Sequence, residues 1–196
     1  MTSQVIDRDR GYAAFVKQFT TVKGKQGRVG IFAGKNNKEG KSIAEYATYN
    51  EFGATITSLK ARMWLRHAIN RSIIEGGATT AKWSNKPVGY IHIPERSFLR
   101  STYDEQRQAV IKVMRARLQK ATKQELISGK LFEICLKTAC QWLVDQVKRK
   151  ISDSKSWASS NSKVTVFLKS KHKGKDQPLM DTGAMRAAVT YQITTD

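Results

Sequence analysis

Residues 42–54 read Ser-Ile-Ala-Glu-Tyr-Ala-Thr-Tyr-Asn-Glu-Phe-Gly-Ala, a stretch whose pattern predicts one short helix that ends in a turn. Ser42 is a favourable N-cap residue, and Glu45 stands three positions later, where a capping box has its acid. Ile43 and Ala47 lie on one helical face. Gly53 can adopt the left-handed conformation that ends many helices. We therefore expect a helix over 43–52.

A second segment, Ile93-Pro-Glu-Arg-Ser-Phe-Leu-Arg100, begins with a proline that cannot donate a hydrogen bond to a sheet. It leads to Ser101, which we expect to cap a long helix with Asp104 three residues on. Neither segment contains a nucleophile beside a base, a metal-ligand spacing or a glycine-rich phosphate loop. Function must therefore be inferred from charge, architecture and resemblance.

The chain is strongly basic, with 35 lysines and arginines against 16 acids in 196 residues and a formal charge of +19. A charge of this size attracts nucleic acid or another polyanion. The alternative is that it keeps an oligomer soluble or pairs with an acidic protein. Hydrophobic residues make up 40% of the chain, which is enough for a folded core.

Two further features limit the class of protein. The sequence has no apolar run of about 18 residues, so we expect no membrane partner. Cys135 and Cys140 are the only cysteines, and their five-residue separation on a predicted helix suits neither a zinc ligand pair nor a disulfide. We expect both to be small core residues in a reducing compartment.

The order of predicted elements indicates an α+β fold: a single domain over 1–196 with a mostly antiparallel sheet, packed by two long helices and a short helix. The predicted helices cover 12–20, 43–52, 102–127 and 130–152, and a capped helical turn is expected at Asp181. The predicted strands cover 28–34, 90–93, 163–168 and the alternating residues Val189, Tyr191 and Ile193.

Residues 55–89 read as an insertion within this domain, with a basic amphipathic helix from Ser58 to Asn70. One interpretation is that this helix binds DNA or a membrane surface. The other is that it packs on its own domain or on a neighbouring subunit.

A basic run at residues 169–175 is predicted to form a loop. Lysines on such a loop would attract phosphates without reading sequence, and the alternative is a solvated tip. The predicted helix over 102–127 also carries cations on its outer side. The candidate contacts to DNA or to an acidic partner are Lys169, Lys171, Lys173, Lys175 and Arg115.

Three segments together resemble bacteriophage head–tail connector proteins of the tail-completion or neck group, of the virion-morphogenesis type. They are Ile43-Ala-Glu-Tyr-Ala-Thr-Tyr-Asn-Glu-Phe-Gly-Ala54, Ile93-Pro-Glu-Arg-Ser-Phe-Leu-Arg100 and Pro178-Leu-Met-Asp-Thr-Gly-Ala-Met-Arg186. With their flanking strands, the resemblance covers about residues 28–54 and 90–195.

The resemblance implies a structural protein of the virion, assembled in the bacterial cytoplasm, with no catalytic, metal or cofactor site. It implies a homo-oligomeric ring, expected to be a hexamer, around the DNA channel at the head–tail junction. Neighbouring connector and tail proteins are the implied partners, with non-specific DNA contact in the channel. A ring uses two different patches on each subunit.

The motif residues are expected to act structurally. Gly53, Pro94 and Gly183 lie at chain reversals where backbone freedom, or its absence, is needed. The charged residues of the motifs either form an ion-pair network that joins the three segments or bridges subunits, or are local caps and solvated charges. The candidate structural residues are Glu51, Phe52, Gly53, Pro94, Arg96, Phe98, Arg100, Asp181, Thr182, Gly183 and Arg186.

The sequence leaves two other classes of function to compare with this one. A phage or prophage accessory protein that binds nucleic acid non-specifically would also explain the charge, and it predicts salt-dependent binding to duplex DNA. An enzyme such as a nuclease or a peptidoglycan hydrolase is disfavoured, because the acids are scattered without a metal-binding or paired acid–base pattern.

Overall fold

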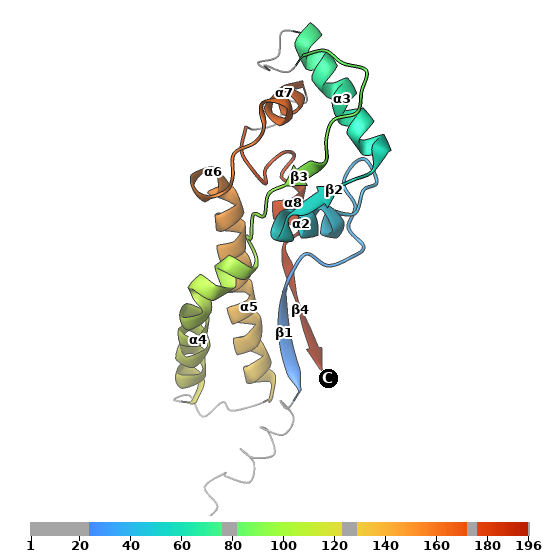
Figure 1. Cartoon of the computed structure of the whole chain (residues 1–196). Helices are drawn as coiled ribbons and strands as arrows, with labels where there is room; N and C mark the ends of the chain where they lie inside the picture. The colour runs from blue at the N-terminus through green and yellow to red at the C-terminus, as the bar shows by residue number, and fades with distance from the viewer. Residues whose placement is uncertain (1–23, 76–81, 123–128, 172–175, 196) are drawn as a thin grey trace, which may run out of the picture. The chain divides into compact units, whose positions relative to one another are not determined.

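A computed structural model describes residues 24–75, 82–122, 129–171 and 176–195 (Figure 1). Helices and short strands are mixed along the chain, which confirms the α+β class. The elements, in order, are β1 (Lys25–Gly30), α2 (Ile43–Phe52), β2 (Ala54–Ile56), α3 (Leu59–Ile74), β3 (Ile91–Ile93), α4 (Arg100–Thr122), α5 (Gly129–Ser152), α6 (Ser154–Trp157), α7 (Lys163–Lys171), α8 (Ala184–Ala188) and β4 (Thr190–Thr195).

The strands pair as two small antiparallel sheets, β1 with β4 and β2 with β3. The described residues divide into two compact units. One contains residues 24–29, 106–122, 129–143 and 191–195, and the other contains 30–75, 82–105, 144–171 and 176–190. Helices α4 and α5 contribute residues to both units. The assignment of residues 1–196 to one domain stays a prediction.

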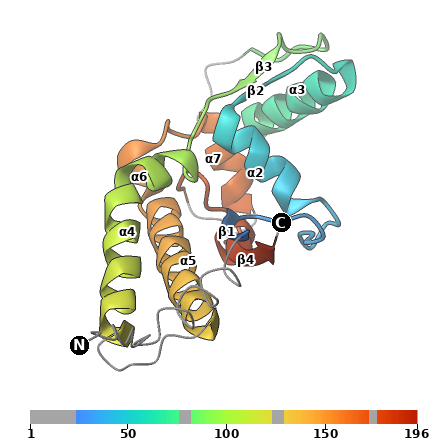
Figure 2. The same ribbon diagram turned by 90° about the horizontal axis from the view of Figure 1, so that it is seen from below.

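In the first unit, strand β1 packs closely on helix α5. A Cβ added at Gly27 would lie 2.4 Å from Cys140 Sγ and 3.2 Å from Leu136 Cδ1, so only a glycine fits there. Cys135 and Cys140 are buried free thiols, as predicted for core residues, and burial raises the pKa of both. Helices α4 and α5 lie side by side in two perpendicular views (Figures 1 and 2).

Lys25 also ties β1 to α5 in this unit. Its Nζ lies 2.9 Å from the Glu133 carboxylate. Glu133 also pairs with Lys137 one helical turn away, over 2.7 Å. Hydrogen bonds from Lys137 and Lys25, together with their charges, lower the pKa of Glu133 to about 2.

The second unit has its core where several short elements meet the end of α5. Helix α2 packs against α8. The most buried apolar side chains in this unit are Ile43, Ala47, Phe98, Val144, Val147, Ile151, Met185, Ala188 and Val189. Ser154 is also buried, and its hydroxyl donates a hydrogen bond to the carbonyl of Pro178.

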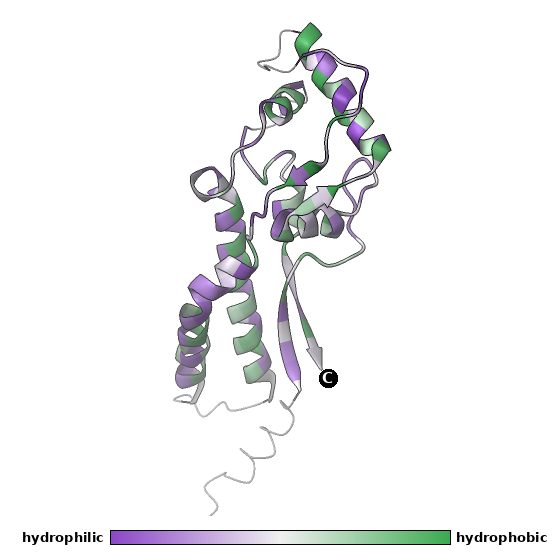
Figure 3. Ribbon diagram, viewed as in Figure 1, coloured by the Kyte–Doolittle hydropathy of each residue, from purple (hydrophilic) through white to green (hydrophobic). Residues whose placement is uncertain are grey.

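The predicted insertion leaves and returns through adjacent strands. Ala54 pairs with Ile93, and Ile56 pairs with Ile91, in the antiparallel β2–β3 ladder. Helix α3 packs against α7. The hydropathy colours of α3 alternate along the helix (Figure 3), which is the pattern of an amphipathic helix. The prediction of a helix within 55–89 is therefore confirmed, with α3 running four residues beyond Asn70.

Helix α2 has the predicted bounds. Ser42 Oγ accepts a hydrogen bond of 3.4 Å from the Glu45 amide, and Gly53 has a φ of +70°. The capping box is only half formed, because the Glu45 carboxylate accepts from the Tyr49 hydroxyl over 2.9 Å. The helix predicted over 130–152 is also confirmed. The helix expected over 12–20 lies outside the described residues.

The strand predicted at 163–168 is wrong, because these residues form helix α7. Ser162 begins the helix: its Oγ accepts from the Thr165 amide over 3.2 Å, and its carbonyl accepts from Val166 over 2.9 Å. This capping and the packing on α3 outweigh the preference of Val164 and Val166 for strands.

Other predicted boundaries change. The first strand is β1 at Lys25–Gly30 and not 28–34. Helix α4 begins at Arg100, so Ser101 is not its N-cap. The basic run at 169–175 is not wholly a loop, because Lys169 and Lys171 belong to α7. Near Asp181, the short helix α8 begins only after Gly183, which has a φ of +79°.

Candidate functional site

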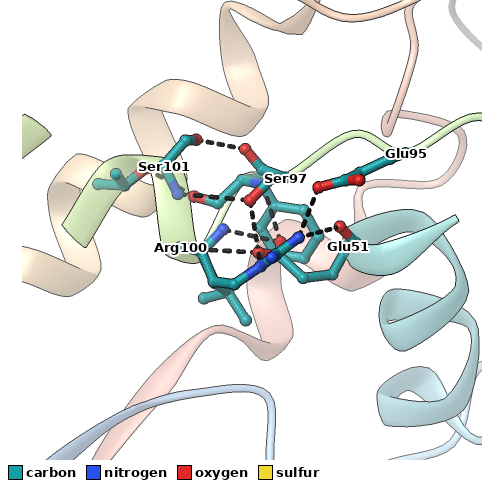
Figure 4. A network of polar contacts seen from close by, with 8 residues as sticks. Glu51, Glu95, Ser97, Arg100 and Ser101 are labelled. Carbon is teal, nitrogen blue, oxygen red and sulfur yellow. Dashed lines mark hydrogen bonds and ion pairs between the residues drawn. The ribbon is translucent and has the colours of Figure 1, made fainter. Parts of the chain in front are cut away.

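The Glu51 carboxylate, at the end of α2, accepts hydrogen bonds from the segment that begins α4 (Figure 4). Its Oε2 accepts from the Phe98 amide over 2.8 Å and from the Leu99 amide over 2.9 Å. Its Oε1 accepts from the Arg100 amide over 2.9 Å and from the Ser97 hydroxyl over 2.8 Å. Glu51 is therefore the N-cap of α4, supplied from a distant part of the chain.

A carboxylate is favourable at this position because the amides at a helix N-terminus have no partners within the helix and together carry partial positive charge. Glu51 is 3% exposed, so water does not replace these contacts. Burial raises the pKa of its carboxyl, but the hydrogen bonds from Leu99, Arg100, Ser97 and Phe98 outweigh burial and leave the pKa below its ordinary value. The buried group is held as a carboxylate, in a ring of donors that satisfies it.

We call the contact between residues 50–53 and residues 93–100 the Glu51 joint. The side chain of Arg100 strengthens this joint. Its guanidinium donates to the Glu51 carbonyl over 3.2 Å and lies 3.4 Å from Glu51 Oε1. It also lies 2.5 Å from Glu95 Oε1 and stacks 4.6 Å from the centroid of the Phe52 ring. The Arg100 side chain thus contacts Glu51 and Phe52 in one segment and Glu95 in the other, by charge and by cation–π attraction.

A second cross-link connects Asn50 with Arg96. The Arg96 amide donates to the Asn50 carbonyl over 2.7 Å, and the Arg96 guanidinium lies 3.4 Å from Asn50 Oδ1. The guanidinium also donates to the carbonyls of Ser159 and Ser160, over 3.0 and 3.5 Å. Burial lowers the pKa of Arg96. The segments Asn50–Gly53 and Ile93–Arg100 are therefore joined at two adjacent points.

Gly53 allows the two segments to approach. A Cβ at this position would lie 3.0 Å from the Ile93 carbonyl oxygen and 3.1 Å from the Glu95 amide nitrogen. The positive φ adds strain for any residue with a side chain. Pro94 follows strand β3 directly, and Phe98 is fully buried beside Glu51. The predicted structural role of Gly53 therefore has a steric explanation.

The third segment contacts α2 by packing and does not join the charged joint. Met185 and Ala188 of α8 are buried where α8 meets α2. Thr182 Oγ1 accepts from the Ala184 amide over 3.3 Å, and Arg186 donates to the Lys148 carbonyl over 3.4 Å. Of the predicted five-residue ion network, the described structure forms only the Glu51–Arg100 pair, while Asp181 and Arg186 lie elsewhere. The charge of Asp181 acts on Lys169 and Tyr46.

The residues predicted to contact DNA or an acidic partner differ in their surroundings. Lys169 donates to the carbonyls of Gln177 and Met180 over 2.7 and 2.8 Å, and burial lowers its pKa. Lys171 forms an ion pair with Glu75 at the end of α3. Lys173 and Lys175 lie outside the described residues. Arg115 is exposed on α4, so it is accessible to a partner.

Three residues of the joint were not predicted from the sequence: Ser97, Glu95 and Asn50. A local capping pattern would not have found Ser97, because its Oγ accepts from the Ser101 amide over 3.4 Å, four residues on, whereas an N-cap side chain accepts from an amide two or three residues on. Ser101 instead donates its hydroxyl to the Ser97 carbonyl. No local pattern in the sequence predicts the pairing of Asn50 with Arg96.

The contacts of Glu51, Arg96 and Arg100 order the backbone and hold the segments Asn50–Gly53 and Ile93–Arg100 together. Over the described ranges, no group of three or more His, Cys, Asp or Glu side chains is placed to hold a metal ion. Within the same ranges, no helix has the length and apolar character needed to cross a membrane. Comparison of the chain with protein-family models, curated proteins and solved structures gives no match.

Proposed function

We propose that the chain is a structural protein of a bacteriophage virion, acting as a ring at the head–tail junction in a neck or tail-completion role. It would assemble in the host cytoplasm, without catalysis, and contact itself and neighbouring connector and tail proteins. The observation that carries the proposal is the Glu51 joint. Two of the three segments that resemble the connector group are held together there by the Glu51 carboxylate and Arg100.

The character of the joint supports a scaffolding role. Its polar atoms are used within the chain: the carboxylate caps a helix, and the guanidinium spans the segments. Such a joint resists local opening, because breaking it would leave the buried Phe98 amide without an acceptor. The third segment contributes the apolar side chains of α8 that pack against α2.

The charge of α4 supports contact with DNA in a channel. From residue 106 to the end of the helix there is no acid, and five exposed cations follow one another: Arg107, Lys112, Arg115, Arg117 and Lys120. Lys169 and Lys171 are poorer candidates, because the chain's own carbonyls and Glu75 occupy them. The channel-facing surface is therefore assigned to α4 in this proposal.

The experiment is deletion of the gene from the phage or prophage that encodes the chain, followed by electron microscopy of the particles. We expect DNA-packed heads and separate tails that fail to join, or heads that lose their DNA. Supplying the wild-type chain from a plasmid should restore joined particles. Normal particles at normal yield without the chain would contradict the proposal.

The acid-free run of α4 also favours a second candidate, a phage accessory protein that binds DNA as a lone subunit. If all five cations contact phosphates, the logarithm of the binding constant should fall against the logarithm of salt concentration with a slope of about −4.5. Submicromolar binding to duplex DNA with this slope, by a chain that is dispensable for particle assembly, would favour the accessory protein. Weak binding by the lone chain is expected of the connector.

A further inference from the structure

The sequence places opposite charges on two consecutive helices. Residues 42–59 form the longest run in the chain without a lysine or arginine, and they contain α2 with its glutamates Glu45 and Glu51. The next 12 residues contain four cations, Lys60, Arg62, Arg66 and Arg71, all on α3. In a chain of charge +19, α2 is therefore an acidic exception beside a basic helix.

The exposed side of α3 mixes cations with large apolar side chains. Lys60, Trp64, His67, Arg71 and Ile74 follow one another at alternating steps of four and three residues, so they form one stripe. All five are exposed, with Trp64 at 62% and Ile74 at 76%. We call these five residues the α3 stripe.

The other sides of α3 already have partners in the chain. Arg62 donates to the Val88 carbonyl over 2.7 Å, and Arg66 donates to the Lys86 carbonyl over 2.9 Å. Asn70 exchanges two hydrogen bonds with the backbone of Ser84, over 2.8 and 3.3 Å. Helix α7 packs on α3 as well. The α3 stripe is thus the side that the described chain leaves uncovered.

Helix α2 has an exposed stripe of complementary chemistry. Glu45, Tyr49 and Phe52 follow at steps of four and three residues, and Tyr49 and Phe52 are 43% and 58% exposed. We call these three residues the α2 stripe. Its one charged residue, Glu45, is acidic. Beside the stripe, Glu95 forms an ion pair with Arg100, which lies over Phe52, so these two exposed side chains add one charge of each sign.

We propose that the α3 stripe of one copy of the chain docks on the α2 stripe of another copy. Each stripe supplies what the other lacks: Trp64 would pack on Tyr49 and Phe52, and the cations on either side of it, Lys60 and Arg71, would face carboxylates. Duplex DNA would match the cations and leave the apolar side chains without a partner. The proposal rests on the proposed ring function, for which it names the contact between subunits.

The contact is heterologous, because two different patches of each chain meet. Such contacts repeat from subunit to subunit and close into a ring when the rotation allows it. After the first contact, one copy keeps its α2 stripe available and the other copy keeps its α3 stripe. The chain can therefore extend past a dimer without any other surface.

The first test is the mass of the purified full chain by sedimentation and light scattering, at concentrations up to roughly 1 mM. We expect oligomers larger than a dimer. Trp64→Ala should raise the dissociation constant roughly thirtyfold, because buried tryptophans dominate such contacts. Trp83→Ala is the matched control, since Trp83 is similarly exposed at 57% and lies outside both stripes, and it should change nothing. A wild type that stays monomeric, or equal effects of the two variants, would overturn the proposal.

The second test reverses charges. Arg71→Glu and Glu45→Lys should each weaken self-association about tenfold or more, because like charges then meet across the contact. Mixing these two variants should restore association, since each stripe then meets a partner of opposite charge. Lys155→Glu, an exposed charge reversal on α6, is the control that should have no effect. Failure of the mixture to recover would overturn the proposal.

The third test asks whether the contact is heterologous. Trp64→Ala retains an intact α2 stripe, and Phe52→Ala retains an intact α3 stripe. A mixture of these two should stop at heterodimers, because only one good contact can form. Large oligomers in the mixture would contradict the assignment. If Arg71→Glu abolished binding to a DNA duplex and left self-association unchanged, the α3 stripe would be a DNA surface and the proposal would be overturned.

Failure of this proposal is distinguishable from failure of the proposed function. If particles need the chain and Trp64→Ala supports assembly normally, the contact is wrong and the connector role stands. If the contact passes its three tests in solution and particles assemble without the chain, the contact stands and the connector role is wrong.

Discussion

The carboxylate of Glu51 accepts a 2.8 Å hydrogen bond from the backbone amide of Phe98, a residue 47 positions further along the chain. Leu99 and Arg100 donate their amides to the same carboxylate. A single side chain of α2 therefore begins α4, and the stability of both helices depends on it.

Replacing Glu51 with alanine should lower the free energy of unfolding by about 3 kcal/mol, because the buried amide of Phe98 and the part-buried amides of Leu99 and Arg100 would lose a charged acceptor. Glu51→Gln should cost less, since an amide oxygen still accepts from some of the donors. Urea denaturation measures both. Glu39→Ala is the matched control, because Glu39 forms an exposed pair with Lys41, and it should cost under about 0.5 kcal/mol. Equal effects at the two positions would contradict the capping role.

Acid should weaken the joint through the lowered pKa of Glu51. A carboxyl with a lowered folded-state pKa stabilises the fold fully above its ordinary pKa of 4.5, and this stabilisation is lost as the pH falls through the folded-state value. The difference in melting temperature between wild type and Glu51→Gln should therefore shrink as the pH falls below the ordinary value of 4.5. Glu133 also titrates there, with a pKa of about 2, but it is present in both proteins and cancels. A constant difference across this range would contradict the prediction.

Gly53→Ala should destabilise the chain by about 3 kcal/mol, since it combines backbone strain with a clash against the backbone of Ile93 and Glu95. Gly40→Ala is the matched control, because Gly40 has a similar φ of +78° and open space around it. The control should cost about 1 kcal/mol, from backbone strain alone. Denaturation of both variants separates the two causes, and equal losses would contradict the steric explanation.

Gly27→Ala should destabilise the first unit by about 2 kcal/mol, because the new methyl group would overlap Cys140 Sγ. Cys140→Ala removes that sulfur and should relieve part of the clash. The double variant should therefore be more stable than the sum of the single effects predicts, by about 1 kcal/mol. Additive effects in this cycle would show that β1 and α5 do not pack this closely.

Local sequence signals predicted well those elements whose ends are set by neighbouring residues. Helix α2 is the clearest case, because Ser42 and Gly53 at its two ends act within the helix itself. The long helix α5 followed from its repeated apolar positions. Strand β3 was predicted with the right alternation, since Ile91 and Ile93 are the less exposed face.

Helices α4 and α7 show where local signals fail. Ser101 looked like a cap, yet the amides of α4 are satisfied by Glu51. The valines of α7 favoured a strand, yet the helix is capped by Ser162 and packs on α3. In both cases an interaction other than the expected one determined the outcome, and for α4 the partner, Glu51, lies far away along the sequence.

The amino-acid sequence alone determined the charge of the chain and the ends of α2. These are the excess of 19 positive charges, the acidic run before a basic one, and the turn at Gly53. Only the tertiary structure determined which of those charges are already neutralised within the chain. It places Glu51 in a ring of amides, Lys169 on two carbonyls and Lys171 beside Glu75, while Arg115 and the α3 stripe remain exposed. The physical reason is that helix periodicity and caps act over a few residues, whereas the partner of a charge is set by which distant backbone groups the fold brings within hydrogen-bonding distance.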